Sequence, residues 1–367
     1  MSIQTAYSTK PLPDAVTELR GDLRGAAPRV VLFFASTDYD AAAVSEQLQR
    51  AFPGACVAGC STAGEIAGGK MLRGSIVAMF LDDEIVEDAA AVVVENLGSG
   101  TGLAAPFAAL EAHFRTPAAT WNFEKYVGLV LVDGLSGAEE RLMEKLGDST
   151  EVFFVGGSAG DDLKFKGTHV CAGGRTYSDS AVLVLMRLRG GFEIVKTQSF
   201  QSTGRSLVAT AVDEARRMVI EFDHKPALEA YAETLGVPYT EAAGRFFEHP
   251  LGLMMKGEPF IRSPQRANGG SIVFYCQIKK GMQLEVLQAT DIVADTRRLI
   301  EAQKAAEGEI RGIIDFHCIL RALQLRKENR CDQYAAIFNG IPMVGFSTYG
   351  EAYLGHLNQT STILLFR

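Results

Sequence analysis

The segment VAGCSTAGEI (57–66) recurs twice in this sequence, as FVGGSAGDDL (154–163) and MVGFSTYGEA (343–352). Each copy follows an apolar segment and a helical segment, and each is followed by a second apolar segment. An internal repeat of this kind indicates one supersecondary unit that is used three times. The small and polar residues of the copies therefore fall at corresponding edges of the predicted sheets, where binding sites commonly form.

The segments around each copy predict strand–helix–strand units. The strands predicted before the copies are VVLFFASTDYD (30–40), YVGLVLVDGLSG (126–137) and RGIIDFHCIL (311–320), and those predicted after them are GSIVAMFL (74–81), SAVLVLMRL (180–188) and TSTILLFR (360–367). Asp40 is the predicted N-cap of the first helix, and Ser136 precedes a second helix that Gly147 ends. The third helix is predicted from about Cys318 through Leu325. This alternation predicts a mixed α/β (α+β) fold.

The sequence between the second and third copies has a different character. Its predicted elements are strands at 192–213 and 217–223, a short helix from Pro226 to Gly236, a strand- and turn-rich stretch at 244–288, and an amphipathic helix at about 291–307. We place a domain boundary at Arg189-Gly190-Gly191. The sequence therefore predicts two mixed-sheet domains, 1–190 and 191–367, built from the repeated units.

Composition and charge exclude several classes of protein. The chain has 367 residues, of which 47% are apolar, so it can bury a large core. Its net charge is −8 and no basic stripe is visible, which argues against nucleic-acid binding. No apolar run is long enough to span a bilayer, and the N-terminus has no apolar signal core. We therefore expect a cytoplasmic protein whose six scattered cysteines are reduced.

Several segments, in order from about residue 28 to the C-terminus, resemble the FIST family. They are GCSTAGEI, GGSAGDDLKF, the SFQSTG…FDHKPALEAY stretch, HPLGL and the terminal FSTYGEAYLGHLNQTSTILLF. The resemblance implies a FIST N-type domain at 1–190 and a FIST C-type domain at 191–367. It also implies a cytoplasmic sensory module that binds a small ligand.

DFHCILR and GHLNQT, both in the third copy, are similar to a haem-binding branch of that family. Members of this branch sense nitric oxide and regulate a separate histidine kinase or cyclic-di-GMP enzyme. The resemblance implies non-covalent haem b in this chain, with either His317 or His356 as the iron ligand. It places Ser347, Tyr349 and Glu351 beside the haem.

His317 stands where the predicted upstream strand of the third copy leaves the sheet. We expect corresponding positions close to Asp133 in the second copy and Thr37 in the first. Strand exits carry ligand-contacting groups in α/β folds, and neutral imidazole is a good axial ligand for haem iron. The competing interpretation is a hydrogen-bonded core histidine. His356 could reach the same pocket from a loop, or could only hold backbone groups there.

The alternative hypothesis is a haem-free receptor for an amino-acid-like ligand. Its candidate residues are Ser61, Thr62, Glu65, Ser158 and Asp161. Hydroxyls and loop amides could hold a carboxylate, and the acidic side chains could hold an ammonium group. The competing interpretation is that these side chains only bond their own turns.

No sequence motif indicates catalysis. The chain has no P-loop and no Rossmann fingerprint. Gly-Ser-Ala-Gly at 157–160 faintly resembles a nucleophile context, but no His-Asp partner is placed for it. We therefore predict a non-enzymatic sensor. Since no kinase or cyclase region is recognisable, we expect the sensor to signal to a separate protein. The sequence does not determine the oligomeric state, and a homodimer is possible.

Overall fold

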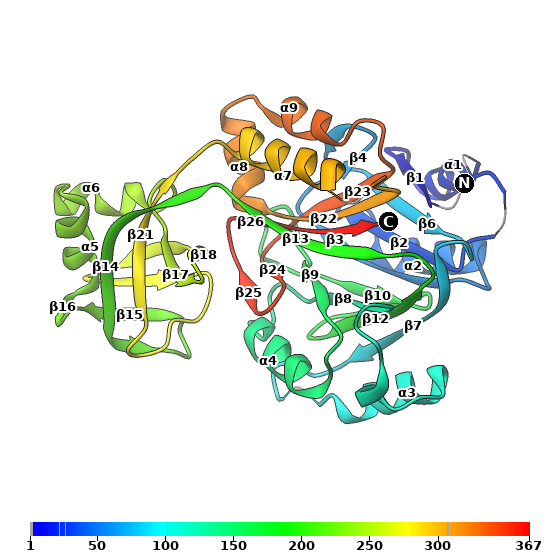
Figure 1. The fold of residues 1–367 in the computed structure, drawn as a ribbon, viewed down its shortest axis with the longest axis horizontal. Coiled ribbons are helices and arrows are strands. Elements are labelled where there is room, and N and C mark those ends of the chain that lie inside the picture. Colours follow the sequence, from blue (N-terminus) through cyan, green and yellow to red (C-terminus); the bar gives the residue numbers. More distant parts are fainter. Residues whose placement is uncertain (1–2, 22, 26, 101, 307) are drawn as a thin grey trace. The chain divides into compact units, whose positions relative to one another are not determined.

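The chain folds into two compact units (Figure 1). The structure is a computed structural model, and it describes every residue except 1–2, 22, 26, 101 and 307. Unit 1 comprises residues 1–197, 296–356 and 361–367, and unit 2 comprises 198–295 and 357–360. Both units combine sheets with helices, which confirms the predicted mixed α/β fold.

The division between the units does not follow a single cut near residue 190. The predicted domains, 1–190 and 191–367, separate the third copy of the repeat from the first two. In the structure all three copies belong to unit 1, and unit 2 is mainly the stretch between the second and third. We refer to residues 30–81, 126–188 and 311–367 as repeats one, two and three. The reason for this division is the way in which the repeats exchange strands.

Unit 1 contains three sheets of six strands, one for each repeat. In spatial order the first has β1 (Ile3–Ser8), β6 (Ile76–Leu81), β2 (Val30–Ser36), β3 (Cys56–Thr62), β10 (Val170–Ala172) and β11 (Arg175–Tyr177). The second has β25 (His356–Leu357), β24 (Glu351–Ala352), β9 (Phe154–Ser158), β8 (Tyr126–Val132), β12 (Ala181–Leu188) and β7 (Val86–Val94). The third has β13 (Phe192–Gln198), β26 (Thr360–Phe366), β22 (Gly312–Cys318), β23 (Met343–Thr348), β4 (Glu65–Ala67) and β5 (Lys70–Leu72).

Each sheet is completed by short strands from another repeat. Strands β10 and β11 of repeat two extend β3 of repeat one, and β24 of repeat three extends β9 of repeat two. Strands β4 and β5 of repeat one extend β23 of repeat three, which closes the cycle. An unpaired sheet edge exposes backbone donors and acceptors, so this exchange satisfies each edge. The three repeats therefore form one body, and no cut can separate repeat three from it.

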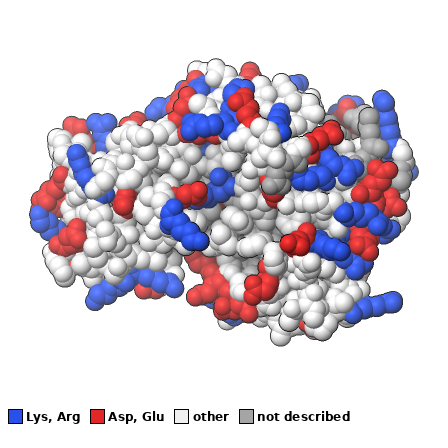
Figure 2. All heavy atoms as spheres, in the orientation of Figure 1, with Lys and Arg blue, Asp and Glu red and all other residues white. Residues whose placement is uncertain are grey.

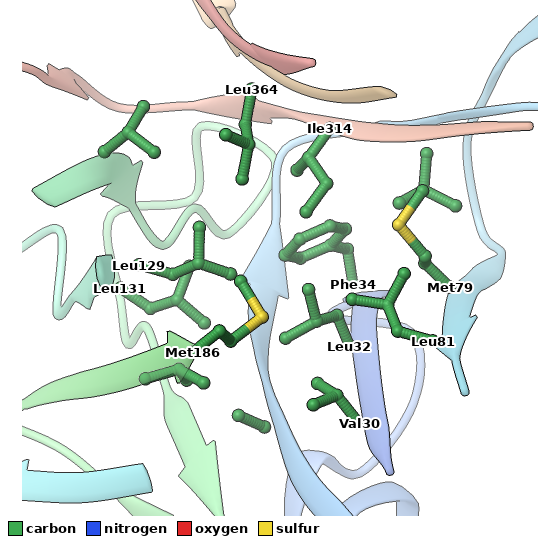
Figure 3. Close-up of a cluster of buried hydrophobic side chains, with 14 of the residues drawn as sticks. Val30, Leu32, Phe34, Met79, Leu81, Leu129, Leu131, Met186, Ile314 and Leu364 are labelled. Atoms are coloured by element: carbon green, nitrogen blue, oxygen red, sulfur yellow. The ribbon is translucent and has the colours of Figure 1, made fainter. Parts of the chain in front are cut away.

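The inner faces of the three sheets share one hydrophobic core. Figure 3 shows Phe34, Leu131 and Ile314, from repeats one, two and three, pointing toward one another. The ring centroids of Phe34 and Phe346 are 4.5 Å apart, and those of Phe34 and Phe316 are 6.4 Å apart. The strands that carry these residues are buried along their whole length, as expected for strands covered on both faces.

Helices cover the outer faces of the sheets. They are α1 (Asp14–Gly21) and α2 (Ala41–Ala51) on the first sheet, α3 (Ala104–Phe114) and α4 (Glu139–Ser149), with the 3₁₀ turn η1 (Ala118–Thr120), on the second, and α7 (Ile292–Ala306), α8 (Ile319–Lys327) and α9 (Cys331–Ala335), with η3 (Ala336–Phe338), on the third. The predicted N-cap is confirmed, since Asp40 accepts a hydrogen bond from Ala43 N at 2.9 Å. Gly147 does not end its helix as predicted, because α4 continues to Ser149.

Unit 2 is built around an eight-stranded sheet. Its elements are β14 (Phe200–Asp213), β15 (Met218–Phe222), β16 (Lys225–Pro226), α5 (Ala227–Leu235), α6 (Tyr239–Ala242), η2 (Ala243–Arg245), β17 (Leu251–Met255), β18 (Glu258–Arg262), β19 (Pro264–Asn268), β20 (Ser271–Phe274) and β21 (Gln283–Ala289). Pro226 precedes α5 and Gly236 ends it with φ at 72°, as predicted. Tyr231 on α5 is fully buried against the sheet.

Candidate functional site

Each repeat has a polar turn at the carboxyl end of its inner strand. The polar turns are Ser61–Glu65, Ser158–Asp162 and Ser347–Glu351. The backbone N–H of the third residue in each turn donates to the carbonyl of the first residue in another: Ala63 to Ser347 at 3.2 Å, Gly160 to Ser61 at 3.0 Å and Tyr349 to Ser158 at 3.2 Å. Through these three bonds each turn donates once and accepts once. The bonds therefore join the three polar turns in a closed ring.

Two polar turns are closed by side chains that bond within the protein. Thr62 donates to Glu65, which also accepts hydrogen bonds from Ser75 Oγ at 2.6 Å and Ser75 N at 3.2 Å. In repeat three, Thr348 Oγ1 donates to Glu351 Oε1 at 2.8 Å. Glu65 and Glu351 are 1% and 0% exposed. These residues stabilise the turns and are not accessible to a ligand.

Glu65 has an altered pKa because of its position. Burial raises its pKa to about 7, against the opposing effect of hydrogen bonds from Ser75 and Thr62. The side chain is therefore partly protonated at neutral pH.

The polar turn of repeat two differs from the other two. Ser158 Oγ lies 3.2 Å from Glu139 Oε1 in the interior. Asp161 is held by the chain that follows it, since its carboxylate accepts backbone N–H groups from Phe165 (2.9 Å), Lys166 (2.6 Å) and Gly167 (3.1 Å). Burial raises the pKa of Asp161, but these bonds and one from Tyr349 outweigh it, so the pKa lies below its ordinary value.

Tyr349 fixes the same segment, which we call the 161–167 loop. Its hydroxyl donates to Asp161 and accepts a hydrogen bond from Leu163 N at 2.7 Å. Its ring stacks on Phe165 with the centroids 5.3 Å apart. Repeat three therefore positions a loop of repeat two. Tyr349 is thus in contact with this loop.

His317 lies on β22, fully buried, beneath α9. Its Nδ1 is 3.0 Å from Tyr334 Oη, which donates to Asp315 Oδ2 at 2.8 Å. Burial lowers the pKa of His317 well below its ordinary value, so the imidazole is neutral. The Tyr334 hydroxyl has one proton, which it donates to Asp315, so it can only accept a hydrogen bond from His317. Nδ1 of His317 therefore carries the imidazole proton. Nε2 is left as an acceptor and has no hydrogen-bond partner among the described residues.

The strand register shows which residues of the other repeats are equivalent to His317. His317 pairs with Ser347, and the corresponding pairs are Ala35 with Ser61 and Val132 with Ser158. The positions equivalent to His317 are thus Ala35 and Val132. They lie close to Thr37 and Asp133, as expected, since Asp133 directly follows Val132 and Thr37 comes two residues after Ala35.

His356 and Ser347 are also buried. His356 is 4% exposed, and its ring lies against Gly350, where an added Cβ would be 2.0 Å from the imidazole Cε1. Ser347 is 1% exposed, and its Oγ has no hydrogen-bond partner among the described residues. His356 belongs to the second sheet and His317 to the third, so the two histidines extend from different sheets.

The packing around these histidines does not fit a haem. The free lone pair of His317 Nε2 has the chemistry of an axial ligand. However, both histidine side chains are enclosed, His317 fully and His356 with 4% of its surface exposed. A haem macrocycle could enter only if the strands and helices around β22 moved apart. Within the described part of the chain, no group of three or more His, Cys, Asp or Glu side chains is placed to hold a metal ion.

A pocket of about 410 Å³ opens instead at the carboxyl ends of β2 and β3. One wall is the segment Thr37–Ala42, which leads from β2 into α2, and the floor includes Ser61. The opposite wall comes from repeat two and includes Asp161, Lys164 and Lys166. A crevice at the carboxyl end of parallel strands is the usual place for a ligand in α/β proteins.

Opposite charges face each other across this pocket. Lys164 Nζ is 3.1 Å from Thr37 Oγ1 and 3.8 Å from Asp38, and its side chain is 46% exposed. Lys166 forms no ion pair within the described residues. On the other wall, Asp40 uses Oδ1 to cap α2, and its Oδ2 has no hydrogen bond within the described part of the chain. The pocket can therefore hold an anionic group and a cationic group at the same time.

The pocket contains part of the predicted ligand set. Of that set, Ser61 and Asp161 line it, whereas Thr62, Glu65 and Ser158 do not. Ser61 Oγ donates to Gly160 O and accepts from His169 N, both at 2.9 Å, so it supports the floor. Lys164, Lys166 and Asp40 were not predicted to bind a ligand. The alternation of Lys164 and Lys166 was the available signal, but isolated lysines in a loop usually indicate only a solvated surface.

Comparison with known families accounts for nearly all of this chain. Residues 29–225 match the FIST N domain, and residues 227–353 match the FIST C domain. The chain belongs to the FIST family. FIST domains are sensory modules that bind small ligands. The junction between the two matches lies at Pro226, within the segment that forms unit 2.

One curated relative of this FIST protein is the uncharacterized protein MJ1623 of Methanocaldococcus jannaschii. It is 25% identical over 199 residues, which cover 50% of this chain and 38% of the relative. The chain therefore matches less than half of that protein's length.

The surface of the FIST protein agrees with its composition. On the face shown in Figure 2, basic and acidic side chains are interspersed and no continuous basic stripe is visible. Among the described helices, none has the length and apolar character needed to cross a bilayer.

Proposed function

We propose that this FIST protein is a sensory receptor for a small amino-acid-like ligand, bound in the pocket at the carboxyl ends of β2 and β3. The observation that carries the proposal is the charge arrangement of this pocket. Lys164 and Lys166 are placed to bind the ligand carboxylate, and Asp40 is placed to bind its ammonium group. A volume of about 410 Å³ lies within the range of small-molecule sites.

In this proposal Asp161 supports the pocket and does not itself bind the ammonium group. Its carboxylate oxygens already accept four hydrogen bonds, from three backbone amides and Tyr349. An ammonium group would have to displace them. Asp161 instead fixes the 161–167 loop, so that both lysines are presented to the pocket.

The loop also gives the receptor a means of output. Leu163 and Phe165, which alternate with the two lysines, are 39% and 56% exposed. Both have positive φ, at 63° and 50°, a backbone conformation that bulky residues rarely adopt. Ligand contacts with the lysines would alter the loop and the apolar side chains that it exposes. We propose that a separate signalling protein detects this change, a histidine kinase or cyclic-di-GMP enzyme as in the branch that DFHCILR and GHLNQT resemble.

The experiment compares three matched probes: alanine, propionate and ethylamine. Alanine carries both charges, whereas propionate lacks the ammonium group and ethylamine lacks the carboxylate. Because binding to the native state stabilises it, we expect a saturable rise in melting temperature that is largest for alanine. The double variant Lys164→Gln/Lys166→Gln should abolish the rise. Lys304→Gln, on the exposed side of α7, is the control and should preserve it.

An equal response to all three probes, or an unchanged response in the double variant, would contradict the proposed ligand class. A larger panel of amino acids then identifies the preferred side chain, since the pocket also offers Ala41, Ala42 and Tyr39 as apolar contacts.

Haem-based sensing of nitric oxide is the second candidate. Its one supporting observation is the neutral, buried imidazole of His317 with Nε2 unbonded. The visible spectrum after haem reconstitution tests it: a stoichiometric Soret band that is lost in His317→Ala or His356→Ala would favour it. Absence of specific haem uptake would eliminate it and leave the amino-acid-like receptor.

A further inference from the structure

The main sheet of unit 2 contains a large irregularity in β14. Ser202 pairs with Leu287 of β21, but Ser206 pairs with Glu285, so residues 203–205 face the single residue Val286. Gly204 has φ at 74°, which permits the distortion. Bulges of this kind redirect side chains and occur preferentially beside functional sites. Here the bulge directs Thr203 and Arg205 into a pocket.

This pocket has a volume of about 330 Å³. Leu235 and Val237, which flank the C-cap of α5, give it an apolar wall. Arg245 and His249 enter from the segment before β17. Two of the segments that resemble the FIST family contribute to this pocket, since Thr203 belongs to SFQSTG and His249 to HPLGL. All of its lining residues belong to unit 2.

The pocket has an excess of positive charge. Arg205 forms no ion pair within the described residues. Its Nη1 donates to Thr234 O at 2.6 Å, which orients the guanidinium group. Arg245 is 3.5 Å from Glu241 and 3.8 Å from Glu248, and these partly exposed pairs are weak. A planar guanidinium group that is already oriented is well suited to bind a carboxylate through two hydrogen bonds.

The remaining polar groups are oriented by the backbone. His249 Nδ1 lies 3.0 Å from the Leu287 carbonyl, which can only accept, so Nδ1 carries a proton. Thr203 Oγ1 donates its proton to Val286 O at 2.7 Å. The pocket thus combines arginine donors with a short apolar wall.

We propose that unit 2 contains a second ligand site at the β14 bulge, for a small carboxylate with a short aliphatic chain. Arg205, supported by Arg245, binds the carboxylate, and Leu235 and Val237 contact the chain. The site goes beyond the receptor function proposed for unit 1, because it uses none of the same residues. It has no acidic side chain among its lining residues, and so does not require an ammonium group.

The test uses the full chain with Lys164→Gln/Lys166→Gln, so that the pocket of unit 1 does not contribute. Butyrate is titrated and its binding is followed by calorimetry and by ligand-observed NMR. We expect saturable binding of butyrate, weaker binding of acetate because of its shorter chain, and none of the neutral isostere butyramide. Arg205→Gln should weaken butyrate binding about tenfold or more, since a charge-assisted hydrogen bond is lost.

Two further variants keep the result interpretable. Val237→Glu places a carboxylate in the apolar wall and should also abolish butyrate binding. Arg216→Gln, an exposed arginine of unit 2 outside the pocket, is the matched control and should bind as well as the parent. If butyrate does not bind saturably, or if Arg205→Gln and Arg216→Gln bind it equally, the second site does not exist. Either result leaves the alanine test of unit 1 unaffected.

Discussion

Repeats one and three share their strand pairing, yet their carboxyl edges differ. In repeat one, β2 ends at Ser36 and α2 begins only at Ala41, whereas in repeat three α8 begins directly after β22. The strand exchange differs as well. Residues 159–169 separate β9 from the hairpin that extends the sheet of repeat one, but only Ala63 and Gly64 separate β3 from the hairpin that extends the sheet of repeat three.

These connection lengths decide what each edge can do. The two longer connections surround a pocket of about 410 Å³ in repeat one. The short connections of repeat three bring α8 and α9 onto the strand ends, and His317 and Ser347 are buried there. One supersecondary unit thus provides an open pocket in one copy and a packed core in another. Loops are the part of a repeat in which such differences are tolerated.

The largest expected effect on stability concerns a glycine that all three repeats have on their inner strand. Gly59, Gly156 and Gly345 occupy the same position, and a Cβ at each would lie 2.2, 1.8 and 2.5 Å from a carbonyl oxygen of the adjacent strand. Gly156→Ala should therefore destabilise the chain by about 3 kcal/mol or more, since backbone on both sides must move. Urea unfolding measures this change.

Gly147→Ala is the matched control for this prediction, because Gly147 lies within α4 and has open space around it. It should stabilise the chain by about 0.5–1 kcal/mol. Equal stability of Gly156→Ala and the parent would show that the strands do not approach as closely as described.

A second prediction concerns Glu65, which links the polar turn of repeat one to the sheet of repeat three. Its pKa of about 7 in the folded protein exceeds the ordinary value of 4.5, so the folded state binds its proton more tightly. Stability from this group is complete below pH 4.5 and is lost as the pH rises toward 7, by on the order of 3 kcal/mol. Glu65→Gln should remove this loss, as unfolding at pH 5 and pH 8 would reveal.

The exposed residue Glu144 provides the control, since Glu144→Gln should leave the pH dependence of stability as it is in the parent. If Glu65→Gln retains the same decline between pH 5 and pH 8, the decline arises elsewhere.

A third prediction tests the strand ends of repeat three, which α8 and α9 cover. Tyr334→Phe removes the hydrogen bond to Asp315 and the contact with His317, both buried. We expect a loss of about 2 kcal/mol, because buried polar groups are left unpaired. Ligand affinity at the pocket of repeat one should not change. Tyr177→Phe is the control, since the Tyr177 hydroxyl has no hydrogen bond within the described residues.

A fall in ligand affinity in Tyr334→Phe, at constant folding, would mean that the two edges are coupled rather than independent. The functional distinction between repeats one and three would then be incorrect.

The smallest effect is expected for Tyr349→Phe, at the open edge. The variant loses the hydrogen bonds that join the hydroxyl to Asp161 and Leu163, at a cost of about 1 kcal/mol because the side chain is half-buried. The 161–167 loop would then hold Lys164 and Lys166 less firmly, so ligand affinity should fall a few-fold. Calorimetry measures the ligand affinity of Tyr349→Phe and of the control variant Tyr353→Phe. Unchanged affinity in Tyr349→Phe would show that the loop is positioned without this hydroxyl.

Much of the local structure was predictable because its causes are local. The Asp40 cap, the start of α5 after Pro226 and the long buried strands follow from side-chain chemistry and hydrophobic pattern. The candidate site was only partly predictable. Ser61 and Asp161 were found through repetition, whereas Lys164 and Lys166 stand in a loop without periodicity. Their role depends on a hairpin that pairs with a different repeat.

The sequence by itself determined that one unit occurs three times, that the sheets are mixed, and that the chain carries the segments of a FIST protein. Only the tertiary structure decided which repeat has a pocket at the carboxyl ends of its strands. The exchanged strands are two or three residues long, too short to show a pattern, and their partners lie far away in the sequence. Their pairing is specified by the need to cover each sheet edge, which is a property of the assembled repeats and not of any one segment.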